Sequence, residues 1–182
     1  MAEETNDKNI KKILLLGLDN SGKTSILLSL TRDTNLMSYY SLTPTKGLNI
    51  KNYSDGMTTF NLWDFGGQEQ YRKEYLKNLQ EYLNADKIIF VIDVQDIERY
   101  DLAFAYLKEI VKVLQTIKNR PEVSIFFHKF DPGLEKKEDF TEEKIHSRLI
   151  AKIKAIFPSD FPYEIFETTI YTIFQKKVVF KL

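Results

Sequence analysis

Residues Gly17-Leu18-Asp19-Asn20-Ser21-Gly22-Lys23-Thr24 match the pattern G-x-x-x-x-G-K-[ST]. They directly follow the apolar run Ile13–Leu16, which we expect to be a buried strand, and they open a segment of helical character, Thr24–Leu30. The two glycines allow the backbone to approach an anion closely, so that successive N–H groups point at it from a helix N-terminus. We therefore predict a phosphate-binding loop. The residues expected to bind phosphates there are Asp19, Asn20, Ser21, Gly22, Lys23, Thr24 and Ser25.

Lys23 and Thr24 have distinct roles in such a loop. Lys23 offers a positive charge to the β- and γ-phosphates, and the Thr24 hydroxyl ligates Mg²⁺. The sequence thus predicts a magnesium–nucleotide site just after the first strand.

Around this loop, short β-rich apolar runs alternate with longer helical stretches. Strands are expected over 13–16, 48–53, 58–63, 88–93, 123–127 and 163–166, and helices over 24–30, 102–117, 142–157 and from about residue 171. Ser54-Asp55-Gly56 is typical of a hairpin turn between the second and third strands. This alternation predicts an α/β fold with a mostly parallel sheet covered on both faces and one antiparallel hairpin. In such sheets ligands bind at the carboxyl ends of the strands.

Composition narrows the function classes. The 182 residues carry 26 basic and 26 acidic side chains, and 43% of them are hydrophobic. That content fits one folded domain, and zero net charge argues against a general nucleic-acid binder. The absence of cysteine excludes disulfides, thiolate metal sites, a cysteine nucleophile and prenyl or palmitoyl anchors.

Targeting signals are not expected either. The segment MAEETNDKNIKK has no apolar core of a signal peptide, and Ala2 stands where myristoylation needs glycine. The longest apolar run, Ile88–Ile92, is too short to span a bilayer. We therefore expect a cytoplasmic protein without a lipid anchor; peripheral attachment to membranes through a partner stays open.

A second constellation follows the third expected strand, in Trp63-Asp64-Phe65-Gly66-Gly67-Gln68. An Asp at this strand end is suited to anchor Mg²⁺, the Gly67 N–H to reach a γ-phosphate, and Gln68 to orient the attacking water. Thr45, in the polar segment before the second strand, can complete the Mg²⁺ shell when a γ-phosphate is present. We therefore expect Thr24, Thr45 and Asp64 at the metal, and Gln68 and Lys23 as the catalytic residues.

A third constellation is His128-Lys129-Phe130-Asp131, which follows the strand 123–127. The Asp131 carboxylate can accept hydrogen bonds from N1 and N2 of guanine, and the Lys129 stem can cover the base. Adenine lacks both donors and would leave the carboxylate unpaired. The sequence thus predicts guanine specificity, with His128 in a supporting role.

These stretches together resemble the small GTP-binding proteins of the Ras superfamily, and most closely the Arf-like branch. The specific pointers are GLDNSGKT with Asp19, PTKGLN, and WDFGGQEQYR with Trp63 before Asp64. The resemblance runs from about residue 11 to about residue 170. His128, where the usual base motif has Asn, and Thr168-Thr169-Ile170-Tyr171 are similar to the Rag branch instead.

The resemblance implies a P-loop NTPase G domain with a six-stranded, mostly parallel sheet and about five helices. It implies one such domain over residues 1–182, with a polar tail over 1–10, and leaves open whether the natural chain continues past Leu182. By position, Thr169 and Ile170 offer backbone N–H groups to the guanine O6.

The resemblance also implies a GTP/GDP-dependent switch that hydrolyses GTP slowly. An exchange factor, a GTPase-activating protein and effectors would bind through Ser38–Gly47 and Phe65–Tyr75. Arg72 is expected to face solvent or a partner. A Rag-like nucleotide-sensing scaffold or dimerising GTPase with little turnover is the open alternative, while a phosphate-loop kinase is disfavoured because no Arg-rich lid is evident.

Overall fold

The structure is a computed structural model that describes residues 9–30, 35–54 and 57–171. It contains one six-stranded sheet in the order β2-β3-β1-β4-β5-β6. The strands are β1 (Asn9–Gly17), β2 (Leu48–Ser54), β3 (Thr58–Phe65), β4 (Lys87–Asp93), β5 (Glu122–His128) and β6 (Glu164–Thr168). All neighbours are parallel except the β2–β3 pair, which is antiparallel. The expected six-stranded, mostly parallel sheet with one antiparallel hairpin strand is confirmed.

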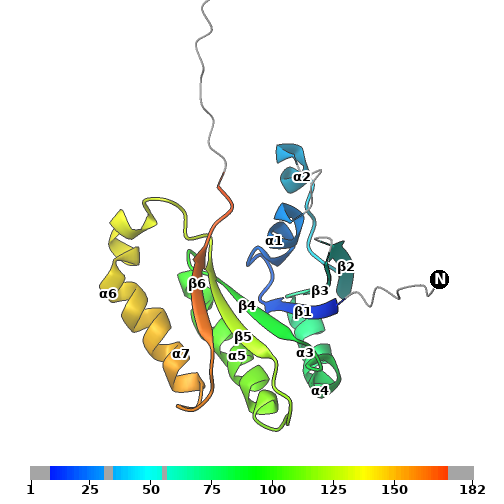
Figure 1. Cartoon of the computed structure of the whole chain (residues 1–182). Helices are drawn as coiled ribbons and strands as arrows, with labels where there is room; N and C mark the ends of the chain where they lie inside the picture. The colour runs from blue at the N-terminus through cyan, green and yellow to red at the C-terminus, as the bar shows by residue number, and fades with distance from the viewer. Residues whose placement is uncertain (1–8, 31–34, 55–56, 172–182) are drawn as a thin grey trace, which may run out of the picture.

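The α-helices lie around this sheet (Figure 1). They are α1 (Lys23–Ser29), α2 (Leu36–Tyr40), α3 (Glu69–Lys77), α4 (Leu79–Tyr82), α5 (Tyr100–Leu114), α6 (Glu142–Ile145) and α7 (Ala151–Ile156). A π-helical turn, His146–Ile150, joins α6 to α7, so 142–156 is one interrupted helix. Short 3₁₀ turns occupy Ile97–Arg99, Leu134–Lys136 and Glu138–Phe140.

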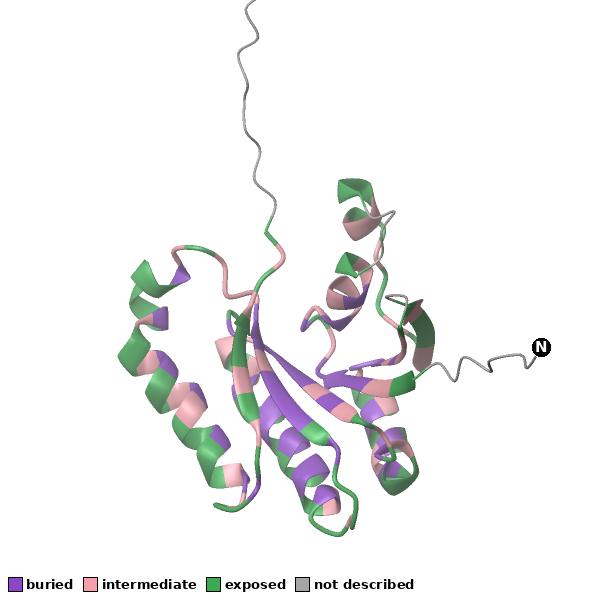
Figure 2. Ribbon diagram, in the orientation of Figure 1, coloured by how far each residue is buried: buried purple, intermediate pink, exposed green. Residues whose placement is uncertain are grey.

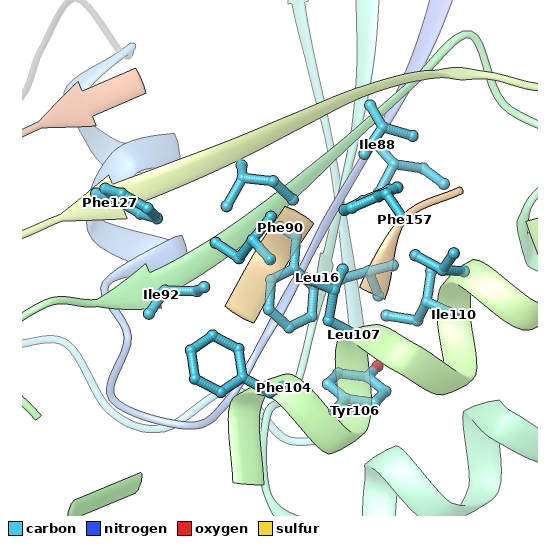
Figure 3. Close-up of a cluster of buried hydrophobic side chains, with 14 of the residues drawn as sticks. Leu16, Ile88, Phe90, Ile92, Phe104, Tyr106, Leu107, Ile110, Phe127 and Phe157 are labelled. Carbon is cyan, nitrogen blue, oxygen red and sulfur yellow. The ribbon is translucent and has the colours of Figure 1, made fainter. Parts of the chain in front are cut away.

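Two apolar clusters hold the helices on the sheet. The larger includes Leu16, Phe90 and Phe127 from central strands, against which α5 places Phe104 and Leu107 (Figure 3). These α5 residues recur at helical spacing, which puts them on one face of the helix. The smaller cluster packs α1 through Leu27 on the other side. Burial is accordingly deepest along the central strands (Figure 2).

Two expectations about the chain ends have different outcomes. β1 begins at Asn9, so residues 9 and 10 belong to the sheet and not to the polar tail. Pairing of Asn9 with Thr58 of β3 explains the extension, because backbone pairing does not need an apolar side chain. The helix expected from about residue 171 lies outside the described residues, as does the Asp55–Gly56 part of the hairpin turn. Among the described residues, no helix has the length and apolar character to cross a membrane.

Candidate nucleotide-binding site

The carboxyl ends of the five parallel strands place the site. β1 ends at Gly17, β3 at Phe65 and β5 at His128. Because these strands run parallel, the loops that follow them gather at one edge of the sheet. A cavity of about 280 Å³ opens there. Its lining residues are Asp19, Asn20, Gly22, Lys23, Thr24, Ser25, Leu42, Thr43, Pro44, Thr45, Phe65, Gly67 and Gln68.

Two glycines shape the phosphate loop. Gly17 and Gly22 have φ of 141° and 93°, a region that residues with side chains rarely adopt. A Cβ on Gly17 would also lie 2.3 Å from the Val91 carbonyl oxygen. The loop therefore requires glycine at both positions, and it runs directly into α1, whose first residue is Lys23.

The Lys23 ammonium group is buried inside this loop. Its Nζ donates to the carbonyl oxygens of Gly17 (3.1 Å) and Leu18 (2.6 Å), and the residue is only 5% exposed. Burial lowers the pKa of Lys23 from 10.5 to about 8, although the carboxylates of Asp64 and Asp19 act to raise it. An anionic ligand bound next to Lys23 would stabilise the protonated form of the lysine and raise its pKa again.

Three oxygen donors converge beside Lys23. The Thr24 hydroxyl lies 2.9 Å from the Thr45 hydroxyl, and both donate to Oδ2 of Asp64, at 2.6 and 3.0 Å. Asp64 is fully buried, and its Oδ1 has no hydrogen-bond partner. A buried carboxylate with a free oxygen beside two hydroxyls is a donor set for a hard cation such as Mg²⁺. The residues expected at the metal therefore lie together and fit it.

The segment after β3 packs against both the segment before β2 and the phosphate loop. The Gly66 N–H donates to the Gly47 carbonyl (2.8 Å). A Cβ on Gly67 would lie 2.1 Å from the Asp19 backbone nitrogen, so this contact needs glycine. Gln68 is the N-cap of α3 and lines the cavity. Both residues expected to face a γ-phosphate and a water are thus at the cavity.

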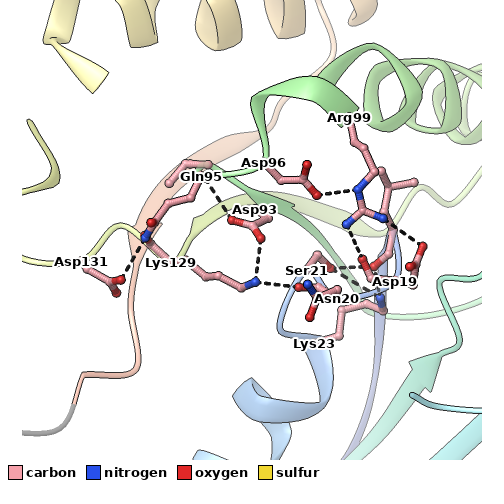
Figure 4. Close-up of polar contacts among 12 residues, drawn as sticks. Asp19, Asn20, Ser21, Lys23, Asp93, Gln95, Asp96, Arg99, Lys129 and Asp131 are labelled. Atoms are coloured by element: carbon pink, nitrogen blue, oxygen red, sulfur yellow. Dashed lines mark hydrogen bonds and ion pairs between the residues drawn. The ribbon is translucent and has the colours of Figure 1, made fainter. Parts of the chain in front are cut away.

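The base loop is joined to the phosphate loop by Lys129. Its Nζ donates to the Asn20 carbonyl (2.8 Å) and to Oδ2 of Asp93 (2.6 Å) (Figure 4). Asn20 and Lys129 both have φ of 60°, and they are the positive-φ residues other than glycine in the described part of the chain. Left-handed backbone at non-glycine residues is concentrated at functional sites. Here the two strained residues hold the two loops in register.

Asp131 is oriented by two neighbours. Its Oδ1 accepts from the Thr169 hydroxyl (2.6 Å), and its Oδ2 accepts from the Gln95 side-chain amide (2.9 Å). Gln95 Nε2 also donates to the Lys129 carbonyl (2.8 Å). Each carboxylate oxygen retains a lone pair for a further donor. Ile170 follows in the same loop and is half-buried.

His128 is buried where three loops meet. Its Nδ1 lies 2.9 Å from the Thr168 hydroxyl, and a Cβ on Gly22 would lie 2.4 Å from its Cδ2. Burial and the neighbouring Lys129 lower its pKa below the usual 6.5. A neutral imidazole therefore ties the end of β5 to the end of β6 while it packs on the phosphate loop.

Arg72 is buried, although we expected it to face solvent or a partner. It does not face solvent: it is 7% exposed, and Nη1 donates to the Gly67 carbonyl (2.5 Å). Its charge is compensated by Asp19 at 3.8 Å and by the Tyr106 ring at 5.7 Å. A charged residue on α3 is expected to be exposed unless the fold supplies partners, and here Asp19 and Tyr106, which compensate the charge, are distant in the sequence.

Sequence reasoning also missed Asp93, Gln95 and Arg99. Arg99 Nη1 lies 3.3 Å from the Asp19 carboxylate, and its Nη2 donates to the Asp19 carbonyl (3.1 Å). Asp93 is the last residue of β4, and Gln95 and Arg99 follow within the next six residues. That position was a usable signal, because the neighbouring strand ends carry the other site residues.

A family model described as "Gtr1/RagA G protein conserved region" matches residues 12–182. This chain belongs to the Gtr1/RagA G protein family. The predicted resemblance to Ras-superfamily small GTPases is confirmed, and the Rag-like base loops at His128 and Thr168–Tyr171 agree with this family.

The chain is also similar to Arf-like proteins, as the loops at 17–24 and 63–68 indicated. It is 46% identical over 91 residues to ADP-ribosylation factor-like protein 3 of Caenorhabditis elegans, covering 50% of this chain and 46% of the relative. It is 39% identical over 102 residues to ADP-ribosylation factor-like protein 2 of Arabidopsis thaliana, covering 56% and 51%. The chain thus spans about half the length of the curated relatives it matches.

Solved structures share the fold. The Arl6 BBS3 small GTPase from Trypanosoma brucei, with the bound nucleotide analogue GppNp, superposes on this chain with a TM-score of 0.68. The two are 23% identical, and the match covers 88% of this chain and 87% of the other. The mammalian SRP receptor matches with a TM-score of 0.62 at 18% identity, over 87% and 91%.

The low pKa of Lys23 predicts pH-dependent nucleotide binding. A bound polyphosphate requires the protonated lysine, so above about pH 8 the complex holds more protons than the free protein. Affinity for GDP should therefore fall by up to about tenfold per pH unit once pH exceeds that pKa. Titrations at pH 7.0, 7.5, 8.0 and 8.5 would measure it, because guanine N1 is still mostly protonated in that range. In Lys23→Met the residual GDP affinity should not change with pH over this range. A wild-type GDP affinity that is independent of pH would contradict the assignment of Lys23 to the phosphates.

Proposed function

We propose that this chain is a guanine-nucleotide-dependent switch that binds GTP and GDP with Mg²⁺ and hydrolyses GTP slowly. The observation that carries the proposal is the convergence of the buried Asp64 carboxylate with the half-buried Thr24 and Thr45 hydroxyls next to the phosphate loop. The described residues act in it as one nucleotide-binding domain. Family membership supports a guanine nucleotide as the ligand.

In this proposal the phosphate loop and Lys23 hold the β- and γ-phosphates. Thr24, Thr45 and Asp64 would hold Mg²⁺, which when bound neutralises phosphate oxygens. Asp131 accepts from N1 and N2 of guanine, while Thr169 and Ile170 offer N–H groups to O6. Lys129 covers the base, supported by His128.

Hydrolysis is assigned to Gln68, which orients water, and to Lys23, which stabilises charge on the phosphoryl oxygens. No arginine occurs between Thr34 and Gly47 to assist in cis. We therefore expect intrinsic turnover on the order of 10⁻⁴ to 10⁻² s⁻¹, with acceleration when a partner supplies positive charge. The location of Gln68 at the cavity favours turnover over a scaffold without it.

Regulators and effectors are proposed to bind Ser38–Gly47 and Phe65–Tyr75. The region before β2 and the edge strand itself expose large apolar side chains. Met37 is 70% exposed, Tyr40 76% and Ile50 47%. Exposed apolar side chains on α2 and on the edge strand β2 support a protein partner at these segments.

Single-turnover hydrolysis of labelled GTP tests the proposal. Gln68→Leu should keep GTP affinity within about threefold and lower the hydrolysis rate by roughly 10- to 100-fold, because water is no longer oriented. Gln80→Leu, on the exposed side of α4, is the matched control and should behave as wild type. Equal rates in wild type and Gln68→Leu would remove the catalytic assignment.

A further inference from the structure

We propose that Arg72 is a positioning residue that holds Gln68 at the phosphate cavity, by linking the Gly67 carbonyl to the Asp19 carboxylate of the phosphate loop. This inference rests on the proposed function and adds a residue to it. The Arg72 guanidinium is almost fully buried beside a cavity that is also lined by the buried Lys23.

The contacts of Arg72 show what it fixes. Its side chain donates to the Gly67 carbonyl (2.5 Å), and its backbone N–H donates to the Gln68 carbonyl (3.0 Å). The first bond fixes the peptide that joins Gly67 to Gln68, and the second begins α3. One residue therefore grips the carbonyl groups on both sides of the Gln68 Cα.

The Arg72 charge is tied to the phosphate loop by Asp19. Nη1 of Arg72 lies 3.8 Å from the Asp19 Oδ1, and Arg99 Nη1 lies 3.3 Å from the same oxygen. Arg99 is in turn held by Asp96 through Nε at 2.5 Å (Figure 4). A carboxylate held on one side by Arg99 gives Arg72 a fixed partner. A buried cation without one would carry a large desolvation cost.

Close packing of Gly67 against the phosphate loop also restricts the position of the Gly67–Gln68 peptide. Gly67 lies so close to the Leu18–Asp19 backbone that a Cβ would be 2.1 Å away. The start of α3 is thus held to the phosphate loop by close packing at Gly67 and by the ionic link through Arg72. Loss of the link should let the Gly67–Gln68 peptide reorient while the rest of the core, including Tyr106, stays packed.

The test compares Arg72→Met, which keeps an apolar stem against Tyr106 and loses every side-chain donor, with Arg72→Lys, which keeps a charge. Single-turnover GTP hydrolysis should fall about 10- to 100-fold in Arg72→Met and less in Arg72→Lys, since a hydrogen bond to a charged group is lost. Affinity for GDP should change less than about threefold. Lys112→Ala, which removes an exposed cation from α5, is the control and should match wild type.

Two further readouts separate positioning from a merely structural role. In an Arg72→Met background, Gln68→Leu should slow hydrolysis by less than about twofold more, because both changes remove the same oriented group. Amide hydrogen exchange over residues 67–72 of the full chain should be at least about tenfold faster in Arg72→Met, with exchange in β4 and β5 unchanged.

Three results would each overturn the proposal. The first is a double variant whose rate loss equals the product of the two single losses. The second is a loss of GDP affinity in Arg72→Met equal to its loss of rate, and the third is unchanged amide exchange over 67–72. A wild-type chain that hydrolyses no GTP would instead defeat the proposed function. In that case the exchange measurement still decides whether Arg72 holds the Gly67–Gln68 peptide.

Discussion

Replacing Asp131 with Asn is expected to convert preference for guanine into preference for xanthine nucleotides. Guanine presents donors at N1 and N2, whereas xanthine has a C2 oxygen that needs a donor. Affinity for GTP should fall by about 10²- to 10⁴-fold, because a site built around hydrogen bonds rejects a mismatched partner strongly. Competition binding with GTP, XTP and ATP would measure the change.

The surroundings of Asp131 allow this variant to fold. The Thr169 hydroxyl can rotate to accept from the new amide, and the Gln95 amide can still donate to its oxygen. ATP serves as the internal control and should gain little. Unchanged GTP affinity would show that this loop does not bind the base.

Thr24→Asn is expected to weaken GTP binding strongly while GDP binding is reduced less. The Thr24 hydroxyl lies 2.6 Å from Asp64 Oδ2, within the proposed magnesium donor set. Mg²⁺ requires close octahedral geometry, so a displaced donor is poorly tolerated. We expect a loss for GTP of roughly 100-fold in Mg²⁺, measured by nucleotide exchange with and without a chelator.

Thr45→Ala is the matched comparison for Thr24→Asn. It removes the hydroxyl that lies 3.0 Å from the same Asp64 oxygen but belongs to the segment before β2. In the proposed switch this hydroxyl senses the triphosphate state, so GDP binding should be spared in Thr45→Ala. Equal losses for GDP and GTP would contradict the sensor role.

The fold was predictable from the sequence because buried parallel strands are continuous apolar runs. Ile88–Ile92 illustrates this, since it forms most of β4. The start of β1 was not predictable, because Asn9 and Lys11 are polar. These residues adopt the strand conformation through backbone pairing with β3. Sequence patterns report side-chain burial and not backbone pairing at a polar strand end.

The site residues show a similar division. Motif residues such as Lys23 and Asp64 were predictable because their spacing along the chain carries the chemistry. Arg72 and Gln95 were not, because their partners are distant in the sequence: Asp19 for Arg72, and Asp131 for Gln95. A charged or polar residue becomes a buried or positioning group only when the fold supplies those partners.

The most direct test of the account is the affinity of the purified chain for GTP, GDP and ATP, measured with and without Mg²⁺. We predict that guanine nucleotides bind at least about 100-fold more tightly than ATP, because only they satisfy Asp131. Removal of Mg²⁺ should weaken GTP more than GDP. Comparable or tighter binding of ATP, or GTP affinity independent of Mg²⁺, would contradict a magnesium-dependent guanine-nucleotide switch.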